Sequence, residues 1–319
     1  MIDPTRLEPG VQAWLARIPQ LHAELGQPAD ATDRTEQRAR EAWVADALAA
    51  EFGTPIDVRA EPEDIEIAGL AARRFRPDVA GPLPTQVFLH GGGFVSGSAR
   101  LLGDAQILSA RAANAGIQII SLEYSLAPEH PYPAAVDDTI AAFTALATDE
   151  SWGADPTRLG VGGGSAGGHI SAVTALRLRE AADGPRLAHV LLEIPAVDLV
   201  GEDWPSMSEF ASDKERAAAM QVALAYAGPS PSDPLINPVR VADLTGLPRT
   251  LVMTAELDPL RDAAEEYGRR IAAAGGDAEV IRGAGQLHGT QGLTGTTASS
   301  RDWQQAATAE LKTYLGRAI

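Results

Sequence analysis

The strongest constraint on the fold is a long alternation of short apolar runs with longer amphipathic runs. Runs of strand length occur at residues 86–90, 117–124, 158–163, 189–195, 249–256 and 278–283. Runs with helical spacing of apolar residues separate most of them, at 104–115, 134–148, 166–182, 260–274 and 302–316. Strands that alternate with helices form mainly parallel, doubly wound sheets. The sequence therefore predicts an α/β fold of this kind.

Three segments lie outside this alternation. Residues 58–76 alternate polar and apolar side chains, which predicts an early antiparallel hairpin. Residues 1–50 are rich in Ala, Glu and Arg and predict two helices. Residues 198–248 interrupt the series with an acidic stretch, a helical segment near 214–226 and a Pro-rich loop. We interpret residues 1–50 and an insertion of about 198–235 as a helical cap on a catalytic domain that spans 51–319.

Both pieces of the predicted cap carry large apolar side chains. Those that would be exposed unless they pack against the sheet edge are Trp14, Leu15, Trp43, Trp204, Met207, Phe210 and Met220. A further helical stripe is expected over Trp43, Val44, Ala47 and Leu48, and another over Trp14, Leu15 and Ile18. Packed over the site, such a cap would enclose a bounded pocket.

A serine lies where a strand is expected to turn into a helix. Ser165 is the central residue of GGSAG at 163–167, between the run at 158–163 and the helix-like run that begins at 166. In this context G-x-S-x-G forms a sharp turn that exposes the serine hydroxyl as a nucleophile. The other interpretations are a Gly-rich turn and a phosphate-binding loop, and the second lacks the lysine that a P-loop requires.

A second glycine-rich segment, HGGGF at 90–94, directly follows the first predicted parallel strand. Three consecutive glycines leave the backbone bare, so its amides can point at an oxyanion. A flexible glycine turn is the simpler interpretation. The occurrence of this loop upstream of the serine turn favours the oxyanion role.

A base for Ser165 is expected at the carboxyl end of the last strand. His288 follows the run at 278–283, and a loop at that edge can reach across the sheet to the serine. The other five histidines lie in predicted helices, in the glycine loop, in a Pro-rich loop or at the start of a strand: His22, His90, His130, His169 and His189. We therefore expect His288 to be the base.

The acid is expected between the serine and the histidine in chain order. Asp258 follows the strand-like run at 249–256 and precedes a helix. Glu256 and Asp262 compete for this role, although the first is still near the strand and the second is already in the helix. Asp258 could also serve as a helix N-cap, because Asp-Pro-Leu is a good helix start. We expect the catalytic role.

Composition excludes several classes of function. The chain has no cysteine, which excludes disulfides, thiolate metal sites and a cysteine nucleophile. The formal net charge of −17 argues against binding to nucleic acid or to anionic membranes. No zinc-like spacing is found, and neither a metal nor another cofactor is expected. The sequence shows neither a signal peptide nor a membrane span, so a cytoplasmic location is expected.

With these residues in place, the chain resembles the hormone-sensitive-lipase-like branch of the α/β-hydrolases, which includes many bacterial carboxylesterases. The similar stretches run in family order: HGGGF at 90–94, YSLAPEHPYPAAVDD at 124–138, GGSAGG at 163–168, DPLRD at 258–262 and LHG at 287–289. The resemblance implies an eight-stranded, mostly parallel sheet with a helical cap. It covers most of the chain from about residue 55 onward.

The resemblance also implies roles for individual residues. Carried onto the matching positions, Ser165, Asp258 and His288 form a catalytic triad. The backbone amides that would form the oxyanion hole are those of Gly92, Gly93 and Ala166. The implied reaction is hydrolysis of a small-molecule carboxylic ester, without a cofactor and with a preference for short acyl chains. An amidase or lactonase that uses the same triad, and a non-catalytic receptor on the same fold, are the alternatives, and His288 argues against the receptor.

Three positions depart from the family pattern. Gly164 replaces the Asp or Thr that usually precedes the nucleophile, Ser125 replaces an Arg, and Thr290 replaces a Phe. None of these changes removes a reacting group. We expect Phe94 and Thr290 to line the substrate pocket, with Thr290 making its wall smaller or more polar. The natural ester and a homodimer are left open.

Overall fold

The computed structural model describes residues 2–30, 32–199, 204–228 and 233–316. Eight strands form one sheet in the order β1-β2-β4-β3-β5-β6-β7-β8. The β1–β2 and β2–β4 pairs are antiparallel, and every other neighbouring pair is parallel. The strand bounds are β1 Pro62–Ile67, β2 Leu70–Phe75, β3 Leu83–Leu89, β4 Gln118–Leu122, β5 Ala154–Gly164, β6 Leu187–Glu193, β7 Arg249–Leu257 and β8 Ala278–Leu287. The predicted α/β fold with a mostly parallel eight-stranded sheet and an early hairpin is confirmed.

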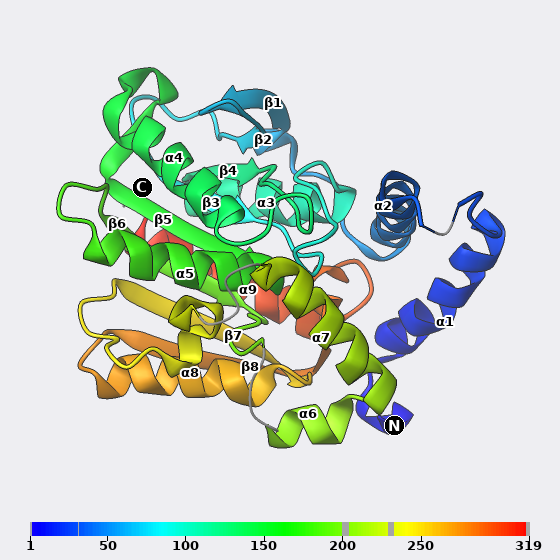
Figure 1. Cartoon of the computed structure of the whole chain (residues 1–319). Helices are drawn as coiled ribbons and strands as arrows, with labels where there is room; N and C mark the ends of the chain where they lie inside the picture. The colour runs from blue at the N-terminus through cyan, green and yellow to red at the C-terminus, as the bar shows by residue number, and fades with distance from the viewer. Residues whose placement is uncertain (1, 31, 200–203, 229–232, 317–319) are drawn as a thin grey trace.

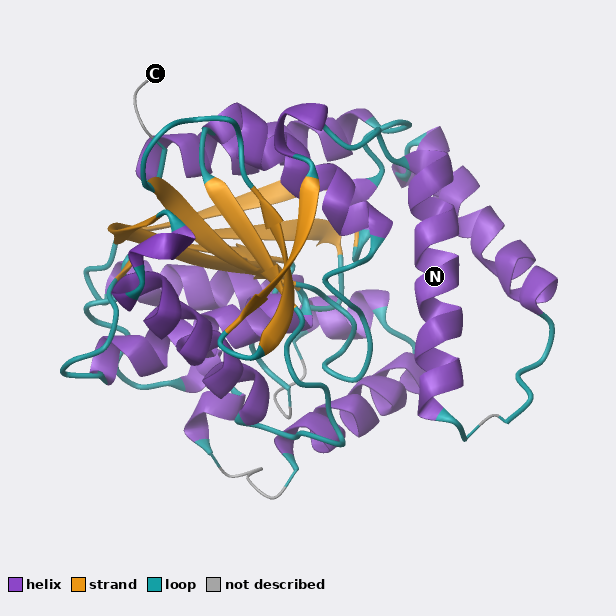
Figure 2. Cartoon of the chain, turned by 90° about the horizontal axis from the view of Figure 1, so that it is seen from above, coloured by secondary structure: helices purple, strands orange, loops and turns teal. Residues whose placement is uncertain are grey.

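Helices cover both faces of the sheet (Figures 1 and 2). Two of them pack on one face, α3 Leu102–Ala115 and α9 Ala298–Tyr314. Three pack on the other, α4 Ala134–Thr148, α5 Ala166–Glu180 and α8 Arg261–Ala273. The strands serve both layers because their side chains alternate: Val87 of β3 joins one buried cluster and its neighbour Phe88 joins the other. This two-sided burial explains the nearly continuous apolar runs in the sequence.

The N-terminal helices lie beside one end of the sheet (Figure 1). They are α1 Pro9–Leu25 and α2 Arg34–Phe52, preceded by a 3₁₀ turn η1 at Pro4–Arg6. Their buried side chains, which include Val11, Leu21 and Val44, form a third cluster with Leu257 and Leu287. Because these leucines are the last residues of β7 and β8, the helices pack at the carboxyl edge of the sheet.

The insertion contributes two helices, α6 Pro205–Phe210 and α7 Asp213–Ala227. Residues 200–203 and 229–232 of the predicted insertion lie outside the described residues, and the domain boundaries stay a prediction. The expectation that all the large apolar side chains of these segments pack inward was wrong. Leu15, Trp43 and Met220 are 41%, 43% and 41% exposed. In α1 the packed stripe contains Trp14 and Ile18, and Leu15 lies about 100° around the helix from Trp14.

Candidate active site

Ser165 lies in a tight turn between β5 and α5. Its φ of 54° falls in the left-handed region, which is uncommon for a residue other than glycine. A Cβ on Gly163 would lie 2.4 Å from the carbonyl oxygen of Leu89, and a Cβ on Gly167 only 1.9 Å from it. Glycine at both positions therefore lets β3 pass directly beside the turn. The Ser165 amide donates a hydrogen bond of 2.9 Å to the carbonyl oxygen of Glu193 at the end of β6.

His288 and Asp258 meet Ser165 at the carboxyl edge of the sheet. Asp258 directly follows β7, and His288 directly follows β8. His288 Nε2 lies 2.9 Å from Ser165 Oγ, and His288 Nδ1 lies 2.8 Å from Asp258 Oδ2. Asp258 is 1% exposed, whereas the His288 side chain keeps 37% of its surface. The imidazole can thus exchange a proton with the hydroxyl and still be reached from the cavity.

The electrostatic environment favours a protonated His288. Burial by itself would lower the pKa of the imidazole, but the charge of Asp258 and the hydrogen bond that His288 donates to it outweigh burial, and the pKa is raised above 6.5. Asp258 therefore stabilises the imidazolium that forms when His288 accepts a proton. The same contact fixes which ring nitrogen faces Ser165.

The two acidic residues that compete with Asp258 are engaged elsewhere. Glu256 forms an ion pair with Arg6 at 2.7 Å and accepts a hydrogen bond from the Gly285 amide. Asp262 accepts hydrogen bonds from the Ser206 amide at 2.8 Å and from Arg261. Neither carboxylate contacts His288 in the described part of the chain. The structure brings only Asp258 to the imidazole.

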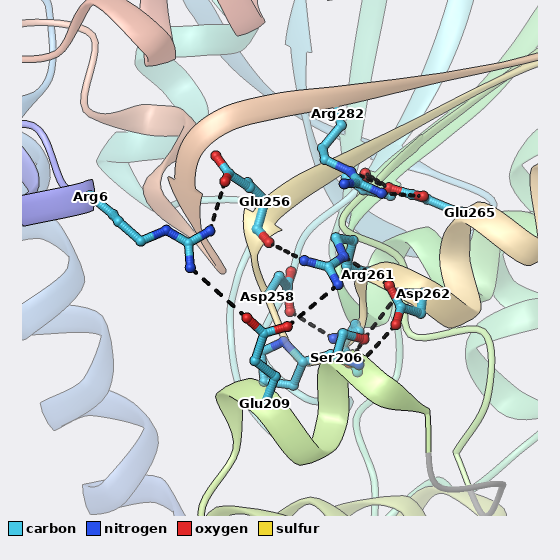
Figure 3. A network of polar contacts seen from close by, with 12 residues as sticks. Arg6, Ser206, Glu209, Glu256, Asp258, Arg261, Asp262, Glu265 and Arg282 are labelled. Atoms are coloured by element: carbon cyan, nitrogen blue, oxygen red, sulfur yellow. Dashed lines mark hydrogen bonds and ion pairs between the residues drawn. The ribbon is translucent and has the colours of Figure 1, made fainter. Parts of the chain in front are cut away.

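A network of ion pairs ties the loop that carries Asp258 to the N-terminal segment and to α6 (Figure 3). Glu209 of α6 lies between two guanidinium groups, 3.9 Å from Arg6 and 3.9 Å from Arg261. Arg261 also donates a hydrogen bond of 2.6 Å to the carbonyl oxygen of Glu256. The Leu260 amide donates to Asp258 Oδ1 at 2.9 Å. These contacts connect the loop that carries Asp258 to several elements at once.

The glycine-rich loop after β3 is held by a buried tyrosine. The Tyr124 ring stacks on His90 with centroids 4.2 Å apart, and its hydroxyl donates to the His90 carbonyl oxygen at 2.8 Å. Gly92 has a φ of 124°, and a Cβ there would lie 2.1 Å from the Ser96 carbonyl oxygen. Only glycine fits this turn. The turn itself therefore requires a glycine at this position, and Tyr124 packs against the start of the loop.

Three backbone amides near Ser165 have no partner among the described residues. The amides of Gly92 and Gly93 donate no hydrogen bond to this part of the chain. Ala166 is the first residue of α5, where backbone amides lack an intrahelical acceptor. Free amides at the start of a helix and in a glycine loop can stabilise a negative charge on oxygen. The position of the three predicted donors thus suits an oxyanion.

A cavity of about 650 Å³ opens over Ser165 and His288. Its walls include α2 at Ala42 and Ala45, α6 at Met207 and α7 at Val222. Phe94 lines it too, stacked on Tyr226 with centroids 4.0 Å apart. Segments far apart in the sequence therefore enclose one space above the reacting groups.

The expectation for Thr290 was wrong. Gly289 and Gln291 line the cavity, but Thr290 does not, because its side chain turns into the protein. It is fully buried, and its hydroxyl accepts from the Leu287 amide at 3.0 Å and contacts Gln286. Position 290 therefore shapes the turn after β8 and not the wall of the cavity.

The other two departures from the family pattern leave the site intact. A Cβ on Gly164 would find no heavy atom closer than Gln291 Nε2 at 3.7 Å, so a side chain could be accommodated there. The Ser125 amide donates to Asp138 at 2.8 Å. Sequence reasoning missed Tyr124 and Gln291 as parts of the site. It also missed Glu193, although a Glu inside an apolar strand run was a visible signal.

No group of three or more His, Asp or Glu side chains within the described ranges is arranged to hold a metal ion. Of the helices described, none is both long and apolar enough to cross a bilayer.

Comparisons with known proteins agree with this geometry. The sequence model of a family described as alpha/beta hydrolase fold matches residues 86–292. The carboxylic ester hydrolase LipN of Mycobacterium tuberculosis is 34% identical over 290 residues, which cover 86% of this chain and 74% of LipN. The carboxylesterase NlhH of the same organism is 33% identical over 304 residues, 91% of each chain. The structure of an esterase from Pyrobaculum calidifontis, 29% identical, superimposes with a TM-score of 0.83 over 96% of this chain and 98% of that one.

Proposed function

Because the chain belongs to the hormone-sensitive-lipase-like branch of the α/β-hydrolase fold family, we propose that it is a carboxylesterase that cleaves short-acyl esters through an acyl-enzyme on Ser165. The observation that carries this proposal is the pair of contacts that His288 makes, 2.9 Å to Ser165 and 2.8 Å to Asp258. Nucleophile, base and orienting acid in this geometry form the arrangement that serine hydrolases use.

Acylation starts when His288 Nε2 accepts the Ser165 proton and Oγ attacks the ester carbonyl carbon. The carbonyl oxygen becomes an oxyanion, which the amides of Gly92, Gly93 and Ala166 stabilise by hydrogen bonds. Collapse of this intermediate breaks the ester C–O bond, and the departing alkoxide takes the proton from His288. The acyl group is then bound to Ser165 Oγ.

Deacylation repeats these steps with water. His288 accepts a proton from the water molecule while its oxygen attacks the acyl carbon. A second oxyanion forms against the same three amides. Its collapse releases the carboxylic acid and returns the proton from His288 to Ser165 Oγ. His288 relays the proton in every step of both half-reactions.

An amidase or lactonase would use the same residues. The named activities of LipN and NlhH favour the ester among these substrates. A receptor on this fold needs no catalytic base. The hydrogen bonds of His288 with Ser165 and Asp258 therefore favour the enzyme over the receptor.

We expect kcat/KM for an activated ester to rise with pH in a single step to a plateau. His288 must be neutral to accept the Ser165 proton, so activity appears as the imidazole loses its proton. Since Asp258 raises the pKa of His288 above 6.5, the midpoint should lie above that value. Asp258→Asn removes the negative charge and should move the midpoint downward. A rate that is highest at about pH 4 would contradict the role of His288.

We expect the highest kcat/KM for acyl chains of roughly two to six carbons, because helices of the cap form part of the cavity wall over Ser165. The walls that α2, α6 and α7 contribute support this proposal. Rates for p-nitrophenyl acetate, butyrate, octanoate and palmitate measure the preference directly. A maximum at palmitate, or strong activation by an oil–water interface, would show that these helices form a mobile lipase lid.

A further inference from the structure

The ionisable side chains that line the cavity are almost all acidic. Apart from His288, they are Glu41, Asp104, Glu193 and Asp198, and no lysine or arginine of the described chain lines it. A cavity with this lining attracts cations and disfavours anionic ligands. The net charge of −17 acts in the same direction over longer distances.

Two of these carboxylates are already neutralised. Glu193 accepts two hydrogen bonds of 2.7 Å from the Arg111 guanidinium, and both side chains are almost fully buried. Asp198 pairs with Arg240 at 3.1 Å. Neither carboxylate is therefore available to a ligand.

Asp104 differs from Glu193 and Asp198 because no residue of the described chain gives it a hydrogen bond or an ion pair. It lies in the first turn of α3 and lines the cavity together with Phe88 and Ile107. Burial raises its pKa to about 7, the charges of Glu193 and Asp46 add to this effect, and Arg111 opposes it. The protein thus holds a carboxyl group without a partner in the wall of the cavity, near the carboxylates of Glu193 and Asp46.

We propose that the ester hydrolysed at this site carries a cationic ammonium group, which Asp104 binds at the wall of the cavity. This inference rests on the proposed esterase function and adds a substrate class to it. A bound cation supplies the charge partner that the chain does not provide, and it does so where water is partly excluded and Coulomb attraction is strong. An anionic ester would meet uncompensated negative charge at the same place.

The test uses pairs of esters that have the same shape and differ only in charge. For the alcohol side, 2-(trimethylammonio)ethyl acetate is compared with 3,3-dimethylbutyl acetate. For the acyl side, methyl 4-(trimethylammonio)butanoate is compared with methyl 5,5-dimethylhexanoate. Because size and shape are matched, the ratio of the two kcat/KM values within a pair measures recognition of the charge.

In the wild-type protein we expect the cationic ester of at least one pair to be preferred by about tenfold or more. Asp104→Asn should reduce that ratio by about tenfold, since the amide has similar size but no charge. Asp46→Asn is the matched control: it removes a neighbouring negative charge outside the cavity lining and retains an acceptor for the Leu102 amide. Its ratio should change by less than about threefold.

The pH dependence of the ratio gives a second test that needs no variant. The quaternary ammonium keeps its charge at every pH, and titration of His288 affects both esters of a pair alike. The ratio should therefore rise with pH through about 7 as Asp104 ionises. The other charged or titratable groups around Asp104 are Glu41 and Asp46 on α2, Arg111 on α3, Glu193 on β6, and Tyr124 and His288 in loops.

Ratios near one for both pairs would overturn the inference, as would a preference that Asp104→Asn leaves unchanged or that Asp46→Asn reduces equally. Failure of the proposed function looks different, because the wild-type protein would then hydrolyse neither the neutral esters nor p-nitrophenyl acetate.

Discussion

Replacing Ser165 by alanine is expected to reduce ester hydrolysis by at least about three orders of magnitude. The hydroxyl is the only group that His288 Nε2 contacts at 2.9 Å in the described chain, and without it no acyl-enzyme can form. The fold should persist, because the Ser165 backbone retains its hydrogen bond to the Glu193 carbonyl oxygen. Initial rates with p-nitrophenyl butyrate and a thermal melt measure both effects.

Two further variants make this result specific. Ser151 lies on the 3₁₀ turn η3, Glu150–Trp152, where it is exposed and away from the cavity, so Ser151→Ala should keep wild-type rates. Combining Ser165→Ala with His288→Ala should reduce the rate of ester hydrolysis little more than Ser165→Ala alone, because residues of a triad act as a unit. Near-wild-type turnover by Ser165→Ala would refute the mechanism.

A loss of stability of about 3–5 kcal/mol is expected for Arg111→Met. Arg111 and Glu193 are 1% and 2% exposed in their side chains, and their two hydrogen bonds of 2.7 Å neutralise each other's charge. Methionine would leave the Glu193 carboxylate charged and without its main partner in the interior. Trp303 also donates to this carboxylate at 2.6 Å, but an indole N–H cannot replace a positive charge. Denaturant unfolding measures the change in the free energy of unfolding.

The matched variants separate the buried charge from the loss of side-chain volume. The double variant Arg111→Met with Glu193→Gln removes both charges and keeps an acceptor for Trp303, so it should be more stable than Arg111→Met. Arg74→Met breaks a more exposed pair with Glu63 and should cost about 1 kcal/mol or less. Equal decreases in the free energy of unfolding for Arg74→Met and Arg111→Met would show that breaking the buried pair destabilises the protein no more than breaking the exposed one.

The sheet and the reacting residues could be predicted from the sequence because both depend on local signals. Buried parallel strands give nearly continuous apolar runs, and the residues that follow them reach one edge of the sheet. Ser165, Asp258 and His288 each directly follow such a strand. The strand ends were harder to predict. β5 begins at Ala154, before the apolar run, because Leu83 of β3 pairs with that residue.

Other features depend on contacts between distant residues, which a sequence pattern does not reveal. Arg111 and Glu193 are 82 residues apart, and nothing near either one indicates its partner. Asp104 reads as an ordinary acidic residue in the first turn of a helix until the cavity beside it is seen. Thr290 is one residue from Gly289, which lines the cavity, yet the turn directs its side chain inward. Such directions are set by packing and not by spacing.

Labelling with a p-nitrophenyl phosphonate tests the central claim most directly. The reagent forms a stable covalent bond with an activated serine and not with the other residues of the proposed mechanism. Mass spectrometry of the intact protein and of its peptides should show one adduct per chain, on the peptide that contains Ser165. His288→Ala should react far more slowly, and Ser165→Ala should not react. An adduct on a different serine, or equal labelling of Ser165→Ala, would contradict the assignment of Ser165 as the nucleophile.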